Sequence, residues 1–444
     1  MKHFNWCRIL VCLISVIILS QVFSSCDNPS KSKKKEKRDW TIMLYAAADY
    51  ELIGDPSIPF AENFAANDKV HTLLLQDNYN KKTKFWYVKP DSSLKLVEDS
   101  VEYNMGDEAT LAHYISTSKK KYPADRYILC FYSHGGGWMG CCGDETDNDL
   151  LTNDNIKEGL KAAAGVDIIM FTAPCLMGSI EMAYELKDQA DYIIASENTS
   201  SYFRWFGPMD NLNLTLLNNP KIDSKELSIN IIDWILQYKD ELYGMFDQFD
   251  FGDDSFTYDK FVDYLEKLTM SVVETDKVEI LTSALHDLSL VYAEDIDHFD
   301  SLYTSIYDSL ESYNTVISDL LSLVDQMRKK ELNSTTVAKW NYLETALNNA
   351  IIANCHGDSL EYAGGLNIYC PNPATENYTN YYSGSYYGLD LSTDCYYAQL
   401  LNEMFEYKSG LAKTSLYRHD DFQKNIEIGI QLDQAFIRGL KKKK

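Results

Sequence analysis

The chain has 444 residues, of which 45% are hydrophobic and 13% aromatic, so it can bury a large core, and its length predicts two or three domains. It carries 41 Lys and Arg against 66 Asp and Glu, which gives a formal net charge of −25 at pH 7 and a pI near 4.7. Nucleic-acid binders present a basic face, so this balance argues against nucleic acid as a partner.

Residues 1–25 have the layout of a secretory signal. Lys2, His3 and Arg8 precede an apolar run at 9–22, which is shorter than the roughly twenty residues of a membrane span. Two serines then stand directly before Cys26, an arrangement typical of bacterial lipoprotein signals. We expect cleavage and lipidation at Cys26, with an uncleaved N-terminal anchor as the alternative. The predicted location is the bacterial cell envelope, lipid-anchored at the outer membrane or cell surface, or secreted.

A hydrophilic tether is expected at 26–38, ahead of a folded core at 39–219. In that core, apolar strands alternate with helical stretches. Strands are expected at 41–46, 70–75, 127–132, 167–171 and 192–195, and helices at 110–120 and 180–189. This alternation predicts an α/β fold whose mainly parallel central sheet is covered by helices.

Helical periodicity dominates the segment 220–349 and predicts a largely helical added subdomain. Helices are expected there at 227–243, 258–273 and 304–327. The segment 350–410 is expected to supply a returning strand at 364–371 and a closing helix at 398–407. Residues 411–444 form the predicted C-terminal tail.

Two of the predicted strands end abruptly in a reactive side chain. His134 follows the strand at 127–132 and opens the run His-Gly-Gly-Gly-Trp, and Cys175 follows the strand at 167–171. In open α/β sheets, functional groups gather at the carboxyl ends of the strands. A thiolate is a competent nucleophile and needs a base beside it, so the pair is a candidate cysteine-nucleophile dyad. Taken alone, a buried Cys is more often an inert small hydrophobe and a glycine run more often a simple turn.

The run His-Gly-Gly-Gly also occurs in the oxyanion holes of lipases and esterases of the α/β-hydrolase type. That activity requires a Gly-x-Ser-x-Gly pentapeptide, which this chain lacks. The caspase Gln-Ala-Cys and papain Cys-Gly-Ser-Cys-Trp patterns are absent as well. The esterase alternative is therefore disfavoured.

The sequence resembles the clostripain family of cysteine peptidases, which belongs with caspases, legumains and gingipains in one structural clan. The resemblance spans about residues 39–407 and rests on five segments. These are WTIMLYAAAD from Trp40, HGGGW from His134, CLMGSIE from Cys175, IIASE from Ile193 and GGLNIYCP from Gly364. The resemblance implies a caspase-like αβα sandwich, hydrolysis of peptide bonds through an acyl-enzyme, protein or peptide substrates and no required cofactor.

The resemblance also implies roles for individual residues. His134 would be the general base and Cys175 the nucleophile, and the backbone N–H groups of Gly135 and Cys175 would form the oxyanion hole. Glycine at 135–137 suits this role because a bare backbone lets a substrate approach closely. The alternative function is a catalytically silent relative that serves as a binding or scaffold lipoprotein of the envelope.

The candidate substrate pocket departs from the family pattern. Family members typically carry an Asp two residues before the nucleophile, where it favours a basic P1 residue, but Ala173 occupies that position here. A desolvated Arg or Lys without a carboxylate partner is costly, so a basic P1 preference is doubtful. We include Glu197 and Arg204 as further pocket candidates. If Arg204 points into the pocket, the preference becomes acidic or polar, and the alternative is a solvated loop arginine.

The segment 141–166 between the two motifs is acidic and lies where the family is often cut to activate a zymogen. Its only basic residues are Lys157 and Lys161, and a pocket that no longer accepts a basic P1 residue disfavours self-cleavage there. Its carboxylates are the hard oxygen ligands that Ca²⁺ favours and some relatives require, but the EF-hand pattern is absent. We interpret the segment as a solvated acidic loop and assign no metal site, with Ca²⁺ as the alternative.

Seven cysteines follow Cys26, and an odd number cannot all pair within one chain. At least one thiol is therefore free unless pairing is intermolecular, and Cys175 is the candidate. Cys141 and Cys142 are too close to each other to form a comfortable pair of zinc ligands.

Overall fold

The computed structural model of the chain describes residues 37–49, 60–61, 64, 66–79, 81–99, 102–248, 257–314, 316–373 and 386–409. The predicted signal at 1–25, the lipidation site Cys26, the tether up to residue 36 and the tail from 411 lie outside the described residues. The described elements from Arg38 onward belong to one compact unit.

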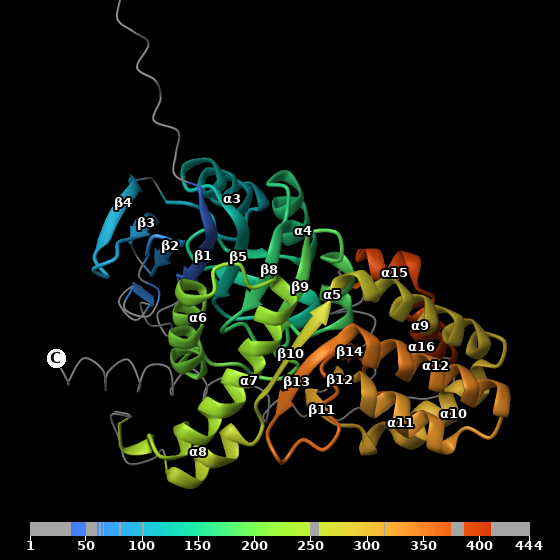
Figure 1. Cartoon of the computed structure of the whole chain (residues 1–444). Coiled ribbons are helices and arrows are strands. Elements are labelled where there is room, and N and C mark those ends of the chain that lie inside the picture. The colour runs from blue at the N-terminus through green and yellow to red at the C-terminus, as the bar shows by residue number, and fades with distance from the viewer. Residues whose placement is uncertain are drawn as a thin grey trace, which may run out of the picture. The chain divides into compact units, whose positions relative to one another are not determined.

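A nine-stranded sheet forms the centre of this unit (Figure 1). In spatial order its strands are β13 (Ile351–His356), β10 (Thr269–Glu274), β9 (Ala190–Ala195), β8 (Val166–Phe171), β5 (Ala124–Tyr132), β1 (Arg38–Ala48), β2 (Val70–Asn78), β3 (Lys84–Val88) and β4 (Leu94–Asp99). Pairing is parallel from β9 through β2 and antiparallel at both ends of the sheet. The five strands predicted between 41 and 195 make up this parallel centre, so the mainly parallel sheet is confirmed.

Side chains of the central strands alternate between two apolar cores, because successive residues of a strand point to opposite faces. In β1, Met43 and Tyr45 belong to one core and Ile42 and Leu44 to the other. Helices α3 (Glu108–Lys121), α4 (Asn153–Ala162), α5 (Ile180–Glu185) and α9 (Val278–Ala293) contribute to the first core. Helices α6 (Phe206–Asn218), α7 (Ser224–Tyr243) and α8 (Tyr258–Leu265) contribute to the second. The predicted αβα sandwich is therefore confirmed.

The segment 220–349 is less purely helical than the sequence predicts. Helix α8 ends at Leu265 and the chain then forms β10, where a helix was expected up to residue 273. β10 pairs with β9 in the central sheet. The boundary that the sequence suggests near residue 219, between the core and the helical subdomain, therefore falls between two strands of the same sheet. Short, fully buried strands share their continuous apolar pattern with buried helices, so periodicity alone does not distinguish them.

A second misassigned helix lies at 304–327. Helix α10 (Ile296–Ile306) is followed by the short strands β11 (Ser312–Asn314) and β12 (Ile317–Asp319) before α11 (Leu320–Lys330) begins. The strand expected at 364–371 is β14 (Asn367–Tyr369), which pairs with β12 in a separate three-stranded sheet. The strand that returns to the central sheet is instead β13.

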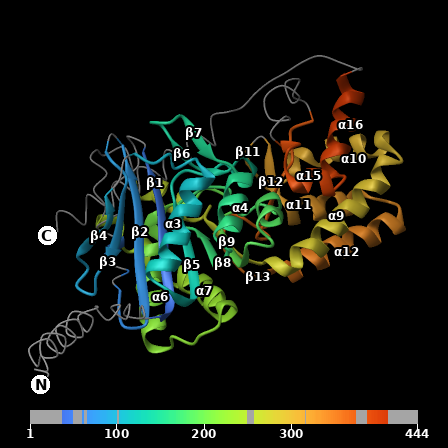
Figure 2. The same cartoon turned by 90° about the horizontal axis from the view of Figure 1, so that it is seen from above.

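Helices from α9 onward gather at one end of the sheet. Figures 1 and 2 show α9, α10, α11, α12 (Ser334–Ala350) and α16 (Tyr397–Ser409) together, at the opposite end of the sheet from β4. Helix α16 occupies the position expected for the closing helix.

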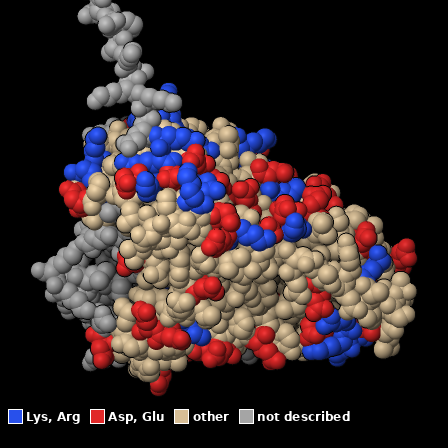
Figure 3. All heavy atoms as spheres, viewed as in Figure 1, with Lys and Arg blue, Asp and Glu red and all other residues tan. Residues whose placement is uncertain are grey.

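Charged side chains are unevenly distributed over the face drawn in Figure 3. Lys and Arg gather along the upper edge of that view, near the amino ends of the parallel strands, with a second group at the lower right, whereas Asp and Glu are spread more widely. The carboxyl ends of the parallel strands, which carry the candidate site, lie at the opposite edge (Figure 1). Among the described residues, the helices are all too short or too polar to span a membrane.

Candidate active site

His134 leaves the carboxyl end of β5, two residues after Tyr132. The Cys142 N–H donates to the His134 carbonyl oxygen at 3.2 Å, and Gly135 forms a bridge with Cys141, so the glycine run is a tight loop. The His134 side chain is partly buried, and this burial lowers its pKa below the ordinary value for histidine. The imidazole is therefore neutral at pH 7, the state that can accept a proton.

Cys175 follows the neighbouring strand β8. Phe131 of β5 pairs with Phe171 of β8, so the two strands end side by side. A Cβ atom on Gly135 would lie 2.5 Å from the Cys175 carbonyl oxygen and 2.9 Å from the Cys175 nitrogen, so only glycine fits there. The backbone that carries His134 is thus packed against the backbone that carries Cys175. The structure brings together the two segments that the sequence singled out.

The Cys175 thiol lies in a nearly closed environment. Its residue is 5% exposed, and the Ser200 N–H donates to the Cys175 sulfur at 3.3 Å. Ser200 belongs to the loop that follows β9, the next strand of the sheet. The Cys175 thiol in turn donates to the Ser200 carbonyl oxygen at 3.8 Å, so both backbone polar groups of Ser200 contact the sulfur. No sequence pattern predicts this contact, because it is made by a backbone N–H.

The loop after Cys175 is held by backbone hydrogen bonds in a conformation that side chains rarely adopt. Leu176 has a φ of +64°, in the left-handed region. Its N–H donates to the Asn198 carbonyl at 2.9 Å, and the Gly178 N–H donates to the Ser196 carbonyl at 2.8 Å. Such backbone strain, on the order of 1–3 kcal/mol, persists only where the surroundings fix it.

Asn367 of β14 connects this loop to the segment after β9. Its side-chain amide donates to the carbonyl oxygens of Leu176 at 3.0 Å and of Glu197 at 2.8 Å. Its own N–H donates to the Gly178 carbonyl at 2.7 Å. Three hydrogen bonds from one buried residue therefore position the Cys175 loop, which explains how the distant segment 364–371 contributes to the site.

Glu197 does not line a pocket that is open to substrate, contrary to the expectation from the sequence. Its side chain is fully buried beside Asp319, which accepts N–H bonds from Ser322 at 2.6 Å and Gly364 at 2.8 Å. Burial first, and the Asp319 charge second, raise the pKa of Glu197 well above its ordinary value, and burial raises that of Asp319 to about 6. Glu197 is thus a buried side chain packed behind the Cys175 loop.

Ala173 and Arg204 differ in their surroundings. Ala173 is half-buried against the second core and offers only a methyl group. Arg204 lies on the short 3₁₀ helix η2 (Tyr202–Trp205) and is 2% exposed, so it is not a solvated loop arginine. Its Nη2 donates to the Thr269 carbonyl oxygen at 2.8 Å, at the start of β10.

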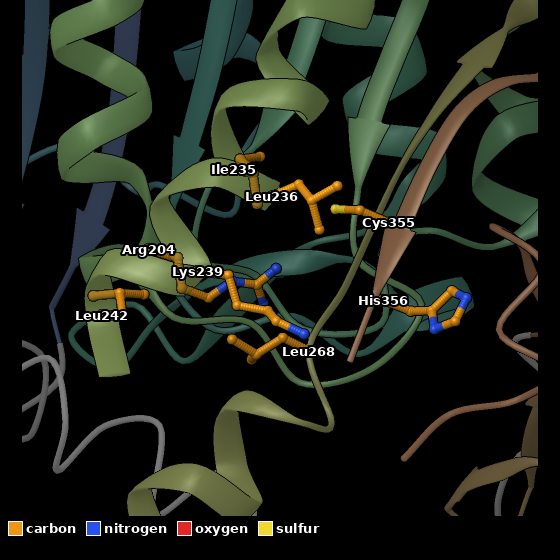
Figure 4. Close-up of a pocket in the computed structure, with 8 residues that line it drawn as sticks. All are labelled: Arg204, Ile235, Leu236, Lys239, Leu242, Leu268, Cys355 and His356. Carbon is orange, nitrogen blue, oxygen red and sulfur yellow. The ribbon is translucent and has the colours of Figure 1, made fainter. Parts of the chain in front are cut away.

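Arg204 lines a small pocket that also contains a second cation (Figure 4). Its lining residues are Arg204, Ile235, Leu236, Lys239, Leu242, Leu268, Cys355 and His356. Figure 4 shows the side chains of Arg204 and Lys239 next to each other, whereas the His356 ring points away from them. The Lys239 ammonium is 3.7 Å from Asp358 and 3.9 Å from Glu266, so its ion pairs are long. Two cations among apolar walls suit an anionic group.

This pocket and Cys175 lie at the same edge of the sheet. Neighbouring strands are about 4.8 Å apart, so the start of β10 is about 10 Å from the end of β8, two strands away. Arg204 is four positions after Ser200, which contacts the Cys175 sulfur.

The acidic segment between the motifs is only partly a solvated loop. It forms a hairpin of β6 (Cys141–Asp144) and β7 (Asp149–Leu151), and residues 145–150 are exposed as expected. Asp144 is an exception, because it is buried beside Asp49 and Asp77, outside the segment. Lys157 lies in α4, where the sequence predicts a short helix at 155–163, and it pairs with several carboxylates.

The cysteines of the described part of the chain are all free and buried. They are Cys130, Cys141, Cys142, Cys175, Cys355, Cys370 and Cys395. The sequence required at least one free thiol, and in the structure all seven remain thiols. Cys175 follows the carboxyl end of β8, whereas Cys130 and Cys355 lie within strands.

The fold is that of the caspase-like α/β proteins, with a thiol and an imidazole supplied from adjacent strand ends. A sequence model of the clostripain family matches residues 60–407, and the chain therefore belongs to the clostripain family. Clostripain of Hathewaya histolytica is 28% identical over 218 residues, which cover 38% of this chain and 40% of that protein. The matched part thus spans less than half the length of this curated relative.

Two solved structures share the fold. A secreted C11 cysteine protease from Bacteroides thetaiotaomicron, in complex with an irreversible peptide inhibitor, aligns with a TM-score of 0.60 and 18% identity over 81% of this chain and 99% of that chain. An inactive zymogen C11 protease from Parabacteroides distasonis aligns with a TM-score of 0.58 and 18% identity over 81% of this chain and 98% of that chain.

Proposed function

We propose that this protein is a cysteine endopeptidase in which Cys175 is the nucleophile and His134 the general base. The observation that carries the proposal is the contact of Gly135 with the Cys175 peptide, which holds the two motifs together at adjacent strand ends. Family membership and the shared fold agree with it. The alternative is a catalytically silent lipoprotein that binds other molecules. The experiments below would support this alternative if they detected no hydrolysis.

The proposed reaction follows from the groups at the site. Neutral His134 accepts the thiol proton as the Cys175 sulfur attacks the peptide carbonyl carbon. The N–H groups of Gly135 and Cys175 stabilise the oxyanion that forms. The two peptide groups are close to each other, because a Cβ atom added to Gly135 would lie 2.9 Å from the Cys175 nitrogen. The protonated imidazole then donates to the leaving amine. Water that His134 activates releases the acyl group and regenerates the thiol, a sequence that requires no redox cofactor.

Thiol labelling tests the activation of Cys175. We expect iodoacetamide at pH 7 to alkylate Cys175 at least about ten times faster than Cys355, because reactivity follows the thiolate fraction. Cys355 is the matched control: it is 9% exposed against 5% for Cys175, but burial raises its pKa to about 11. Peptide mass spectrometry of the full chain measures both rates. Equal rates, or a Cys175 rate that His134→Ala leaves unchanged, would contradict the proposed dyad.

We further propose that the Arg204 pocket binds an acidic or polar P1 side chain. Ala173 provides no carboxylate for a basic residue, and the buried guanidinium and the Lys239 ammonium supply positive charge instead. In peptides that differ only at P1, Glu or Asp should be cleaved fastest. Lys239→Met should slow the Glu peptide about tenfold, equivalent to about 1.4 kcal/mol, and leave the Gln peptide nearly unchanged.

The matched control for this prediction is Lys339→Met, on α12 away from the pocket. It should leave the P1 profile unchanged. A clear preference for Arg or Lys at P1, or an equal loss for the Glu and Gln peptides in Lys239→Met, would contradict the pocket assignment.

We also retain the proposal that the protein is held at the cell envelope by acyl chains on Cys26. It is supported by the signal-like layout of residues 1–25 and by the two serines before Cys26. Protein or peptide substrates outside the cytoplasm would then be within reach of the site.

A further inference from the structure

Two buried carboxyl groups meet behind the loop that carries Cys175. Glu197 lies two residues after β9, in the central sheet, and Asp319 ends β12, in the three-stranded sheet. Both residues are 0% exposed, and their side chains contact each other. Asn367 joins the two segments, because it pairs with Asp319 across β12 and β14 while its side-chain amide donates to the Glu197 carbonyl oxygen at 2.8 Å.

The two carboxyl groups differ in their hydrogen-bond partners. Asp319 accepts the Ser322 N–H at 2.6 Å on one oxygen and the Gly364 N–H at 2.8 Å on the other, which suits an ionised carboxylate. Within the described part of the chain, neither carboxyl oxygen of Glu197 accepts a hydrogen bond of standard geometry from an N–H or O–H group. A buried polar group without a partner is costly, and a protonated carboxyl group gains a donor that Asp319 can accept.

The surroundings of the pair offer no cation to balance two negative charges. Among the described residues, no Lys, Arg or His forms an ion pair with Glu197 or Asp319 at 4 Å or less. Arg204 instead donates to the Thr269 carbonyl oxygen. The groups that face the pair, or that face Glu311 beside it, are Glu311, the Tyr313 hydroxyl, the Gly365 N–H, His356 and Glu361.

We propose that Glu197 is a positioning residue for the Cys175 loop: as a neutral acid, it donates a hydrogen bond to ionised Asp319. This one proton supplies the partner that the Glu197 side chain lacks. It also leaves a single negative charge where two would repel each other in surroundings of low dielectric. Burial raises the pKa of Glu197 well above its ordinary value, which agrees with a proton that is retained at neutral pH.

The backbone on either side of Glu197 holds the Cys175 loop. The carbonyl oxygens of the two residues that flank Glu197 accept the N–H groups of Gly178 at 2.8 Å and Leu176 at 2.9 Å. Repulsion between two ionised carboxylates would move this backbone, and the loop would move with it. The consequence for the reaction rests on the proposed function, whereas the consequence for stability does not.

The pH dependence of stability tests the proton without any need for activity. The full chain carrying Cys175→Ala is the parent, and its thermal melts at pH 5 and pH 8 are compared with those of the same chain carrying Glu197→Gln. A folded-state pKa above the unfolded value of about 4.5 makes the parent lose stability as the pH rises, whereas Gln donates to Asp319 at every pH. We expect the Tm of the Gln variant, relative to the parent, to be about 3 °C more favourable at pH 8 than at pH 5.

Glu331→Gln is the matched control for a buried glutamate that already has donors. Its carboxylate accepts the Asn333 N–H at 2.8 Å and the Tyr292 hydroxyl at 2.9 Å, so glutamine there should lower the Tm at both pH values. Glu197→Ala removes the donor to Asp319 and should melt below Glu197→Gln at both pH values. A Tm difference between Glu197→Gln and the parent that does not change with pH, or that favours the parent at pH 8, would overturn the proposal.

The same proton should affect the pH profile of the chain with Cys175 intact. We expect the ratio of kcat/KM at pH 9 to that at pH 7 to be at least about threefold higher in Glu197→Gln than in the wild type, because only the wild type loses the proton. Equal ratios in two active chains would overturn the positioning role. If the expected Tm result appears but neither chain cleaves peptides, the shared proton is supported and the proposed peptidase function fails.

Discussion

The variant Gly135→Ala is expected to lower kcat/KM at least about a hundredfold while the protein stays folded. The new Cβ atom would lie 2.5 Å from the Cys175 carbonyl oxygen and 2.9 Å from its nitrogen, closer than real Cβ contacts come. Both neighbours are backbone atoms that cannot rotate away, so the loops that carry His134 and Cys175 must separate. A displacement of about 1 Å between reacting groups is enough for a loss of about a hundredfold.

Gly136→Ala is the matched control, one residue further along the same loop. Its Cβ atom would meet the end of the Met139 side chain at 3.0 Å, which can move, and its φ of −130° is accessible to alanine. We expect its kcat/KM to stay within about threefold of the wild type. Initial rates on one fluorogenic peptide and a circular dichroism melt of each variant provide the comparison. Equal activity of the two variants would show that the tight contact is not required.

The parallel centre of the sheet was predictable because its strands are buried on both faces. The strands at 41–46 and 127–132 are continuous apolar runs bounded by polar residues, a pattern that few other structures produce. β10 was missed because the run after Leu265 continues a helical pattern without a proline to end it. The strand β14 was predicted, but the sheet to which it belongs was not. Strand partners depend on contacts between residues far apart in sequence.

The candidate dyad was accessible to sequence reasoning because both side chains directly follow strands. The surroundings of the dyad were not accessible. Ser200 contacts the sulfur through a backbone N–H, which any residue type can supply. Lys239 joins Arg204 from a helix that carries no motif. Glu197 was placed in the pocket because it ends the IIASE segment, but its side chain is buried beside Asp319.

Cys175→Ala is the second variant for which we expect a large effect, a loss of kcat/KM of about a thousandfold or more. Alanine removes the only atom that can form the acyl-enzyme, while the residue is small and the loop is fixed by Asn367, so stability should change little. Cys370→Ala is the matched control: that thiol is also buried, its pKa is raised to about 11 by burial, and it contacts the Tyr303 hydroxyl. This control should lose some stability and keep its activity.

The most direct test combines hydrolysis with detection of the intermediate. The purified full chain, Cys175→Ala and His134→Ala would each be mixed with a peptide library covering all P1 residues, and intact-protein mass spectrometry after rapid acid quench would detect the acyl adduct. The account predicts cleavage and an adduct on Cys175 in the wild type, no adduct in Cys175→Ala, and slow acylation in His134→Ala. Cleavage that survives Cys175→Ala, or a folded wild type that neither cleaves nor acylates, would contradict it and favour a binding lipoprotein.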